Sequence, residues 1–152
     1  MARKATADDL PRINEIRKQV NDLHVQGRPD VFRPGFCDEL RDHINEFLTG
    51  EDRAVLVAER DGVVCGMASV NVVARELSPF SLPRRYFHIE EFGVDEAYRR
   101  QGVGTELCEA ARAMAKELGC AKIELDMWEF NADALKFYES LGFHTYRRHL
   151  EL

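Results

Sequence analysis

The spacing of hydrophobic residues divides the chain into a helical first third and a strand-rich remainder. In the first third, apolar residues recur every three or four positions, which is the repeat of one helix face. This repeat predicts a first helix over 6–24, opened by a capping box in which Asp9 replaces the usual Glu or Gln. A second helix is expected over 36–50, after a loop over 25–35 that holds two prolines and two glycines.

Beyond the second helix the pattern changes to short runs that are rich in β-branched residues. Two such runs, over 54–59 and 63–73, flank the pair Asp61-Gly62. This pair is typical of a two-residue hairpin turn, because both turn positions need positive φ. A further strand is predicted over 86–94, so the chain should build a sheet from this point on.

The last third alternates helices with strands. An apolar helix face begins at Val103 and ends at Gly119, which is a typical residue just after a helix. A strand is expected over 120–128, then a short helix between Asn131 as N-cap and Gly142, and a final strand over 143–152. The order of elements predicts an α/β (α+β) fold.

A glycine-rich turn, Arg99-Arg100-Gln101-Gly102-Val103-Gly104, joins the strand over 86–94 to the following helix. Glycines let backbone N–H groups crowd around an anion, and the start of a helix adds unpaired N–H groups and its positive dipole end. The turn therefore fits a phosphate, although its glycines could also serve only to tighten the connection. It lacks the Gly-Lys-Ser/Thr of a P-loop and the first glycine of a dinucleotide fingerprint.

Two spaced patterns resemble those of the GNAT acetyltransferases. Arg99-x-x-Gly102-x-Gly104 resembles motif A of that family, and Asn131-x-x-Ala134-x-x-x-Tyr138-x-x-x-Gly142-Phe143 resembles its second signature. The resemblance implies one acetyltransferase domain over 1–152. It also implies a mixed, mostly antiparallel central sheet that is flanked by about four helices and contains two splayed strands.

The resemblance further implies acetyl-CoA as the cosubstrate and no metal. The coenzyme A pyrophosphate would contact the turn, through Arg99, Arg100, Gln101, Gly102, Val103, Gly104 and Thr105. The pantetheine arm would bond the backbone of Phe92, Gly93 and Val94, near Asn131 and Tyr138. Tyr138 matches the family's general acid, which protonates the leaving thiolate.

Attack on the thioester needs a neutral amine, so a base must take a proton. Strand alternation puts His88 and Glu90 on one face and Glu91 on the other, and a bulge would shift that alternation. Glu90 acting through water is the first candidate, His88 the second, and Glu91 the candidate if a bulge is present. Plainer roles are also open: Tyr138 could be a packing aromatic, and the three strand residues could be solvated or bind cations without proton transfer.

Composition narrows the class of partner. The 152 residues carry 21 basic and 27 acidic side chains, a formal net charge of −6. General nucleic-acid binding needs a basic footprint, so this balance disfavours it and leans towards a cationic acceptor. No apolar run reaches the length of a membrane span and the N-terminus lacks an apolar signal core, so we expect a cytoplasmic protein. The four cysteines match no redox pair or zinc site, so we expect buried, reduced thiols.

Three functions follow from these patterns. The first is an N-acetyltransferase in which a small amine or a peptide amine attacks acetyl-CoA directly in a ternary complex, with Arg28, Asp30 and Phe32 available to touch the acceptor. The second is a non-catalytic acyl-CoA-binding sensor or subunit, and the third a phosphate-binding domain of other function. Family members are often homodimers, but no feature of this sequence establishes one.

Overall fold

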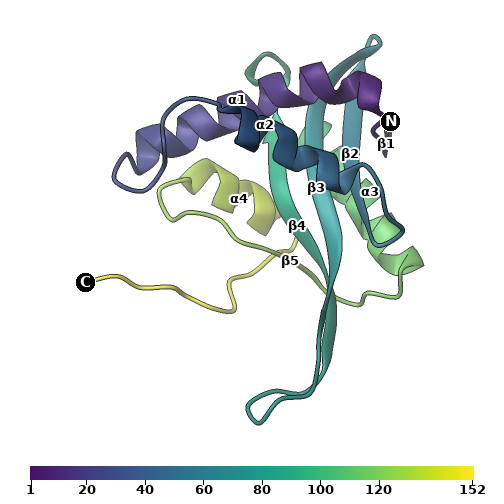
Figure 1. Ribbon diagram of the computed structural model, residues 1–152, viewed down its shortest axis with the longest axis vertical. Helices are drawn as coiled ribbons and strands as arrows, with labels where there is room; N and C mark the ends of the chain where they lie inside the picture. The colour runs from purple at the N-terminus through teal and green to yellow at the C-terminus, as the bar shows by residue number, and fades with distance from the viewer.

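A five-stranded sheet forms the centre of the computed structural model, which describes residues 1–152 (Figure 1). Its strands are β1 (Ala2–Lys4), β2 (Arg53–Arg60), β3 (Val63–Arg75), β4 (Arg84–Val94) and β5 (Ile123–Leu125). They lie in the order β1-β2-β3-β4-β5, and every pair is antiparallel except β4 with β5, which is parallel. The four α-helices are α1 (Leu10–Gly27), α2 (Asp38–His43), α3 (Val103–Glu117) and α4 (Ala132–Ser140). The predicted mixed, mostly antiparallel sheet with about four helices is confirmed.

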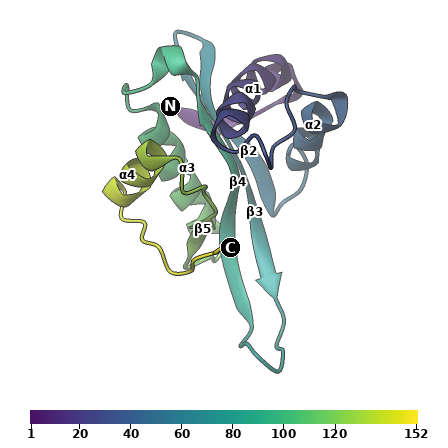
Figure 2. The ribbon, with the colours of Figure 1, turned by 90° about the vertical axis from the view of Figure 1, so that its left-hand side faces the viewer.

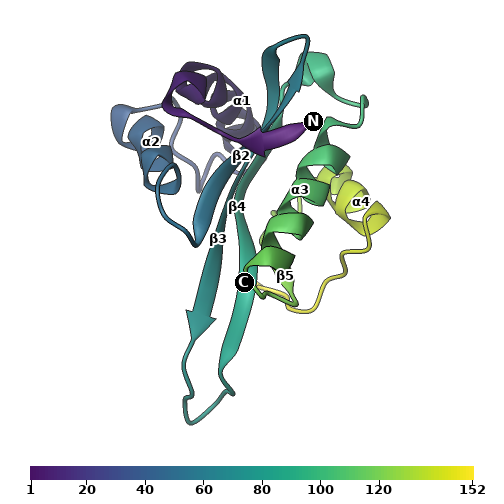
Figure 3. The same cartoon turned by 90° about the vertical axis from the view of Figure 1, so that its right-hand side faces the viewer.

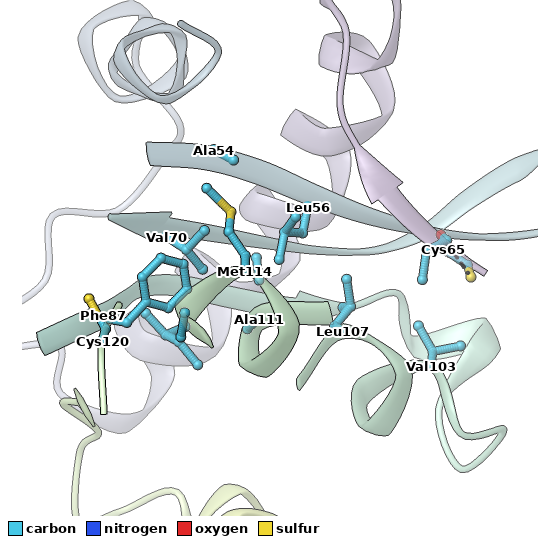
Figure 4. Close-up of a cluster of buried hydrophobic side chains, with 14 residues drawn as sticks. Ala54, Leu56, Cys65, Val70, Phe87, Val103, Leu107, Ala111, Met114 and Cys120 are labelled. Carbon is cyan, nitrogen blue, oxygen red and sulfur yellow. Dashed lines mark hydrogen bonds between the residues drawn. The ribbon is translucent and has the colours of Figure 1, made fainter. Parts of the chain in front are cut away.

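The helices cover both faces of the sheet, with α1 and α2 on one side and α3 and α4 on the other (Figure 2). Strand alternation sends neighbouring side chains to opposite faces, so Leu56 of β2 joins the α3 side while Val55 and Val57 join the α1 side. On the α3 side 14 buried residues form one cluster, in which Phe87 and Val70 of the sheet meet the apolar stripe of α3 (Figure 4). A separate cluster of eight buried residues lies under α1.

The hairpin turn and the N-terminal capping box form where the sequence predicts them. Asp61 and Gly62 have φ of 52° and 77°, as the predicted hairpin turn requires. The predicted capping box is present at the N-terminus, where the Asp9 carboxylate accepts a hydrogen bond from the Thr6 N–H at 2.8 Å. It caps a 3₁₀ turn over Ala7–Asp9 that leads into α1.

Three expectations about elements need correction, and one strand was missed. The second helix is not continuous over 36–50, because α2 ends at His43 and a 3₁₀ turn over Ile44–Phe47 follows. The strand expected over 120–128 is paired only at Ile123–Leu125. The final strand predicted over 143–152 is wrong, since no strand pairs with this segment. Strand β1 was not predicted, because three residues are too few to show an alternation.

The cysteines agree with the expectation of unpaired thiols, and three of the four are buried. Cys65 and Cys120 lie in the cluster under α3, Cys108 is buried on α3 itself, and Cys37 is partly exposed at the start of α2. None of the helices has the length and the apolar composition to cross a membrane.

Candidate active site

An extra residue in β4 opens the sheet. Ile89 lies opposite Val70 and Glu91 lies opposite Ser69, so Glu90 is the bulged residue without a partner of its own. Strand β5 pairs with β4 only from Phe87 to Ile89. The last five residues of β4, 90–94, therefore have a neighbour on the β3 side only. The two strands part at the bulge, which confirms the expected splay.

The edge of β4 that faces this opening carries backbone groups without a strand neighbour, of which the Val94 carbonyl accepts a hydrogen bond from Nε of Arg99 at 3.4 Å. The Asp95 N–H donates to the Cys65 carbonyl at 2.9 Å, so Asp95 points towards β3. Because neighbouring residues of an antiparallel pair direct their N–H and C=O groups to opposite sides, Phe92 and Val94 direct theirs into the opening. The opening thus offers hydrogen-bonding groups at the positions where the sequence predicts contacts with pantetheine.

The glycine-rich turn lies at the far end of the same opening, between β4 and α3. Arg100 and Gly102 both have positive φ, at 64° and 78°, and the α3 helix starts at Val103. The five N–H groups of residues 101–105 donate to no backbone or side-chain acceptor within the chain. A run of free N–H groups at a helix N-terminus is an anion-binding concavity, so the turn has the geometry expected for a phosphate site.

Glycine at position 104 lets α3 approach α4 closely. A Cβ atom added there would lie 2.8 Å from the ring of Phe137, which is too close for an ordinary contact. The Phe137 ring in turn packs against Phe92 of β4, with ring centroids 5.9 Å apart. The glycine-rich turn, α4 and the open end of β4 are therefore packed together around one opening.

The bulge places Glu90 and Glu91 on the same face of the sheet, the α1 side. Phe87 and Ile89 before it, and Phe92 and Val94 after it, all face the cluster under α3. Both glutamates consequently point away from that cluster, which the simple alternation of the sequence did not allow. The shift makes Glu91 geometrically available, as expected for a strand with a bulge.

Glu91 is nevertheless occupied by a buried ion pair. Its two carboxylate oxygens accept hydrogen bonds from Arg17 of α1, at 2.6 and 2.9 Å. The Arg17 side chain is only 2% exposed and also donates to Asn14 and to the Arg41 carbonyl. The pair with Glu91 joins α1 to the sheet, and the bond to the Arg41 carbonyl joins α1 to α2, so Glu91 is engaged in holding α1 in place.

Glu90 lies free of such a pair and beside His88. One Glu90 carboxylate oxygen is 3.0 Å from Nδ1 of His88, and the Glu90 side chain is 43% exposed. Nε2 of His88 lies 3.6 Å from a carboxylate oxygen of Asp126, at the end of β5. Two carboxylates and an imidazole therefore gather at the mouth of the opening, and Asp126 is a neighbour that the sequence analysis did not identify.

Tyr138 approaches the opening from the other face of the sheet. Its ring packs against Phe92 of β4, Phe137 of α4 and Phe143, with centroids between 5.3 and 5.9 Å apart. Burial raises the pKa of the Tyr138 phenol above its usual value, and the neighbouring Cys108 raises it further. The phenol therefore keeps its proton at neutral pH and can donate a hydrogen bond.

Asn131 has a structural role at the start of α4. Its Oδ1 accepts a hydrogen bond from the Ala134 N–H at 3.1 Å, which caps the helix as the sequence predicts. Its Nδ2 group makes no hydrogen bond within the chain and remains able to donate.

Aromatic side chains close the α1 side of the opening. Phe32, from the loop after α1, contacts both His24 and Trp128, with ring centroids 5.0 Å apart in each case. Arg28 lies over the Trp128 ring and pairs with Asp30 and with Glu151 near the C-terminus. The sequence analysis placed the loop near the acceptor but gave no sign of Trp128, because that contact joins residues about one hundred positions apart.

Comparison with known proteins agrees with this geometry. The family model described as Acetyltransferase (GNAT) family matches residues 18–143. Over 121 residues the chain is 33% identical to the L-ornithine N5-acetyltransferase NATA1 of Arabidopsis thaliana, which covers 78% of this chain and 51% of that protein. Over 140 residues it is 27% identical to the aminoglycoside N(6′)-acetyltransferase type 1 of Klebsiella aerogenes, which covers 90% and 91% of the two chains. The chain thus spans about half the length of the plant relative and nearly all of the bacterial one.

A solved structure shows the same fold over the full length. The tetramutant of the BH1408 protein from Bacillus halodurans superposes with a TM-score of 0.94 at 29% identity, over 100% of this chain and 98% of that one. The family match covers most of the chain and includes both the glycine-rich turn and α4. The protein therefore belongs to the GNAT family of acetyltransferases.

Proposed function

We propose that this protein is an N-acetyltransferase that moves the acetyl group of acetyl-CoA onto a primary amine by direct attack in a ternary complex. The observation that carries the proposal is the opening after the β4 bulge. Around it lie a run of free turn amides, the unpaired edge of β4, a carboxylate beside His88 and, on the other face of the sheet, a buried phenol. These groups are what an acyl transfer from a phosphate-bearing thioester requires.

Coenzyme A would be held along this line. The pyrophosphate would accept hydrogen bonds from the turn amides, beside the arginines of the turn, as a charge-assisted contact. The residues in this role are Arg99, Arg100, Gln101, Gly102, Val103, Gly104 and Thr105. The pantetheine arm would bond the edge of β4 at Phe92 and Val94, whereas the backbone groups of Gly93 face β3, and Nδ2 of Asn131 is free to donate to it. No metal takes part in the proposal.

The chain's own groups can manage the protons of the reaction. Glu90, with His88 beside it, would take a proton from the acceptor ammonium directly or through water, and the amine nitrogen would then bond the acetyl carbon. An N–H group of the β4 edge would stabilise the developing oxyanion. As the carbon–sulfur bond breaks, Tyr138 would give a proton to the thiolate, and the second proton lost by the attacking nitrogen would return through water to the Tyr138 oxygen. The base and the acid lie on opposite faces of the sheet, so the amine and the thiol can enter and leave by different sides.

The state of Cys108 supports direct attack over a covalent cysteine intermediate. Cys108 lies beside Tyr138, and burial raises the pKa of its thiol to about 11. At neutral pH the group is therefore a thiol, and the thiol is a far weaker nucleophile than the thiolate. The free Glu90 carboxylate, by contrast, can activate an external amine.

A small cationic amine is the acceptor class that the surroundings favour. Both curated relatives described above are named for the acetylation of small amines, ornithine in one and an aminoglycoside in the other. The mouth of the opening holds Glu90 and Asp126, and the chain as a whole carries a net charge of −6. The cytoplasm is the proposed compartment, because the unpaired cysteines fit a reducing environment.

The test is acetyl transfer from acetyl-CoA to a panel of diamines, amino acids, aminoglycosides and short peptides, with products identified by mass spectrometry. Acetyl-CoA binding is measured by calorimetry on the same protein. The proposal predicts binding and one acetylated class of acceptor. Binding without transfer to any acceptor would favour a non-catalytic acyl-CoA sensor, and absence of binding would contradict the proposal.

A further inference from the structure

The side chain of Arg60, the last residue of β2, points towards the start of α3. Side chains alternate along a strand, and Leu56 and Ala58 of β2 face the α3 side of the sheet. Arg60 follows the same alternation, and its guanidinium pairs with Glu106 in the first turn of α3. Figure 3 shows the β2–β3 hairpin and the segment that leads into α3 at the same end of the molecule. An arginine of the sheet thus lies beside the glycine-rich turn.

Close packing fixes the start of α3 on the sheet next to Arg60. Val103 and Leu107, from the first two turns of α3, are buried. A Cβ atom added at Gly66 of β3 would lie 2.6 Å from the Val103 side chain, so the helix and the strand are in direct contact here. Because the helix start is anchored in this way, the conformation of residues 99–102 depends on the contacts of the turn itself.

The backbone of the turn adopts a conformation that needs support. Arg100 has a φ of 64°, which is costly for a residue with a Cβ atom, and Gly102 has a φ of 78°. Such conformations persist where neighbouring groups hold them. Gln101, between these two residues, makes two hydrogen bonds: its side-chain amide donates to the Ala97 carbonyl at 3.2 Å, and its own carbonyl accepts from Arg60 at 3.3 Å. Of the two, only the bond from Arg60 comes from outside the turn.

The bond from Arg60 also sets the direction of a free N–H group. All peptide bonds of the chain are trans, so the C=O and N–H groups of one peptide unit point in opposite directions. The Gln101 carbonyl and the Gly102 N–H belong to the same unit. Since the carbonyl is directed at Arg60, the Gly102 N–H points away from it, and this N–H is one of the free groups of the turn. Arg60 thereby keeps a carbonyl oxygen, which would repel a phosphate, on the opposite side from that N–H group.

The positive charge of Arg60 is balanced within the chain. One guanidinium nitrogen donates to the Glu106 carboxylate at 2.9 Å and to the Glu59 carbonyl at 2.8 Å, and the other donates to the Gln101 carbonyl. The second carboxylate oxygen of Glu106 lies 2.8 Å from the Met1 ammonium. A guanidinium that is paired with a carboxylate adds little net charge to its surroundings. What Arg60 supplies to the turn is therefore the direction of its hydrogen bond.

We propose that Arg60 is a positioning residue for coenzyme A, which holds the Gln101–Gly102 peptide so that its N–H group faces the pyrophosphate. This role rests on the proposed function and concerns cosubstrate binding only, because no hydrogen bond or ion pair joins Arg60 to Glu90 or Tyr138. Loss of the Arg60 guanidinium should weaken the binding of molecules that carry the pyrophosphate and leave the acetyl-transfer step unchanged. A general loss of structure would impair both.

Arg60→Met keeps an unbranched side chain and removes the hydrogen-bond donors. Isothermal calorimetry should show a Kd for coenzyme A that is raised about fivefold, the size expected for one partly exposed hydrogen bond. The KM for acetyl-CoA should rise by a similar factor, whereas kcat, and turnover with S-acetylpantetheine, which lacks the pyrophosphate, should change less than about twofold. Arg53→Met, at the other end of β2 and bonded to Asp52, is the matched control and should bind coenzyme A like the wild type. Circular dichroism confirms the folding of each variant.

The double variant Arg60→Met with Glu106→Gln separates position from charge. It removes one positive and one negative charge, so the net charge beside the turn is that of the wild type. Positioning predicts that its Kd for coenzyme A stays raised as in Arg60→Met. Recovery of the wild-type affinity in the double variant would overturn the proposal, as would an Arg60→Met variant that binds coenzyme A as tightly as the wild type or loses turnover with S-acetylpantetheine to the same extent. A wild-type chain that binds no coenzyme A would contradict the proposed function itself, and this role with it.

Discussion

Strand β4 behaves differently on the two sides of its bulge. Before Glu90 the strand has neighbours on both edges at Phe87–Ile89, and the Phe87 side chain is fully buried. After Glu90 it keeps β3 as a neighbour but loses β5, and its backbone faces an opening. The first part serves packing and the second part is free for a ligand.

The contrast shows that a small change in one strand is sufficient to open a sheet for a ligand. One inserted residue and a β5 of three residues separate two strands that begin as parallel neighbours. The same insertion puts two glutamates next to each other on one face, where Glu91 pairs with the buried Arg17 and Glu90, partly exposed, lies beside His88. Bulges commonly re-aim side chains next to active sites. At this bulge one glutamate, Glu91, is held in an ion pair, and the adjacent Glu90 is the one proposed to act on the acceptor.

Replacing each of the two glutamates by glutamine should change the free energy of unfolding by very different amounts, and this is the largest expected effect. Glu91→Gln leaves the buried Arg17 guanidinium without its counter-charge, so the free energy of unfolding should fall by about 3 kcal/mol. Glu90→Gln removes a partly exposed carboxylate and should change it by less than about 0.5 kcal/mol. Urea denaturation of both variants at pH 7 measures the difference. Equal losses would mean that the bulge does not separate the two roles.

The glycine-rich turn can be separated from ordinary helix-end geometry by a matched pair of variants. Gly102 and Gly119 have φ of 78° and 70° at the two ends of α3, so alanine at either position costs roughly 1–2 kcal/mol of stability. Only Gly102→Ala also disturbs the free amides, and its Kd for coenzyme A should rise about tenfold, or roughly 1.4 kcal/mol. Isothermal calorimetry on both variants checks this. A similar rise for Gly119→Ala would remove the turn from the site.

A variant of Tyr138, on the other face of the sheet, tests whether its hydroxyl group takes part in the reaction. Tyr138→Phe keeps the ring among Phe92, Phe137 and Phe143 and removes only the proton donor, so kcat should fall about tenfold while the Kd for acetyl-CoA changes less than about twofold. Tyr146→Phe, at an exposed tyrosine that bonds Glu124, is the control. Unchanged turnover in the Tyr138 variant would assign the residue to packing alone.

Replacing Asp9, which lies far from the opening, should have the smallest of these effects and concerns stability alone. Its hydrogen bond from Arg3 lowers the pKa of the Asp9 carboxyl from 3.8 to about 2. A depressed folded-state pKa contributes stability above the unfolded value and loses it as pH falls towards 2. Asp9→Asn should therefore cost about 1 kcal/mol at pH 7, since Arg3 is partly exposed, and the two proteins should converge near pH 2. Thermal unfolding from pH 2 to 7 measures this, and a difference that persists at pH 2 would contradict it.

The local patterns of the sequence were sufficient for the turn at Asp61-Gly62, the Asn131 cap and the glycine-rich turn, because each depends on residues close together in the chain. The final strand was predicted wrongly, since residues 143–152 mix polar and apolar positions but find no neighbour to pair with. The local sequence indicates which residues are suited to a strand, but it does not show whether another strand has a free edge to pair with.

The residues of the candidate site could be predicted from the sequence, but the contacts between them could not. The sequence ranked Glu90 before His88 and kept Glu91 as the candidate if a bulge is present, but it could not show which partners each of them has. The choice depends on Arg17, which lies 74 positions from Glu91, and on a bulge that is visible only in the register of β3 with β4. Asp126 was missed for the same reason, because it meets His88 only when β5 lies beside β4.

The central claim is that the free carboxylate at the bulge activates the acceptor amine. The direct measurement is kcat/KM against pH for wild type and Glu90→Gln, with the acceptor found in the panel. At pH 7 the variant should be slower by at least about a hundredfold, and the gap should narrow at alkaline pH as the amine loses its proton in solution. A variant that stays within about twofold of wild type at every pH would contradict the claim.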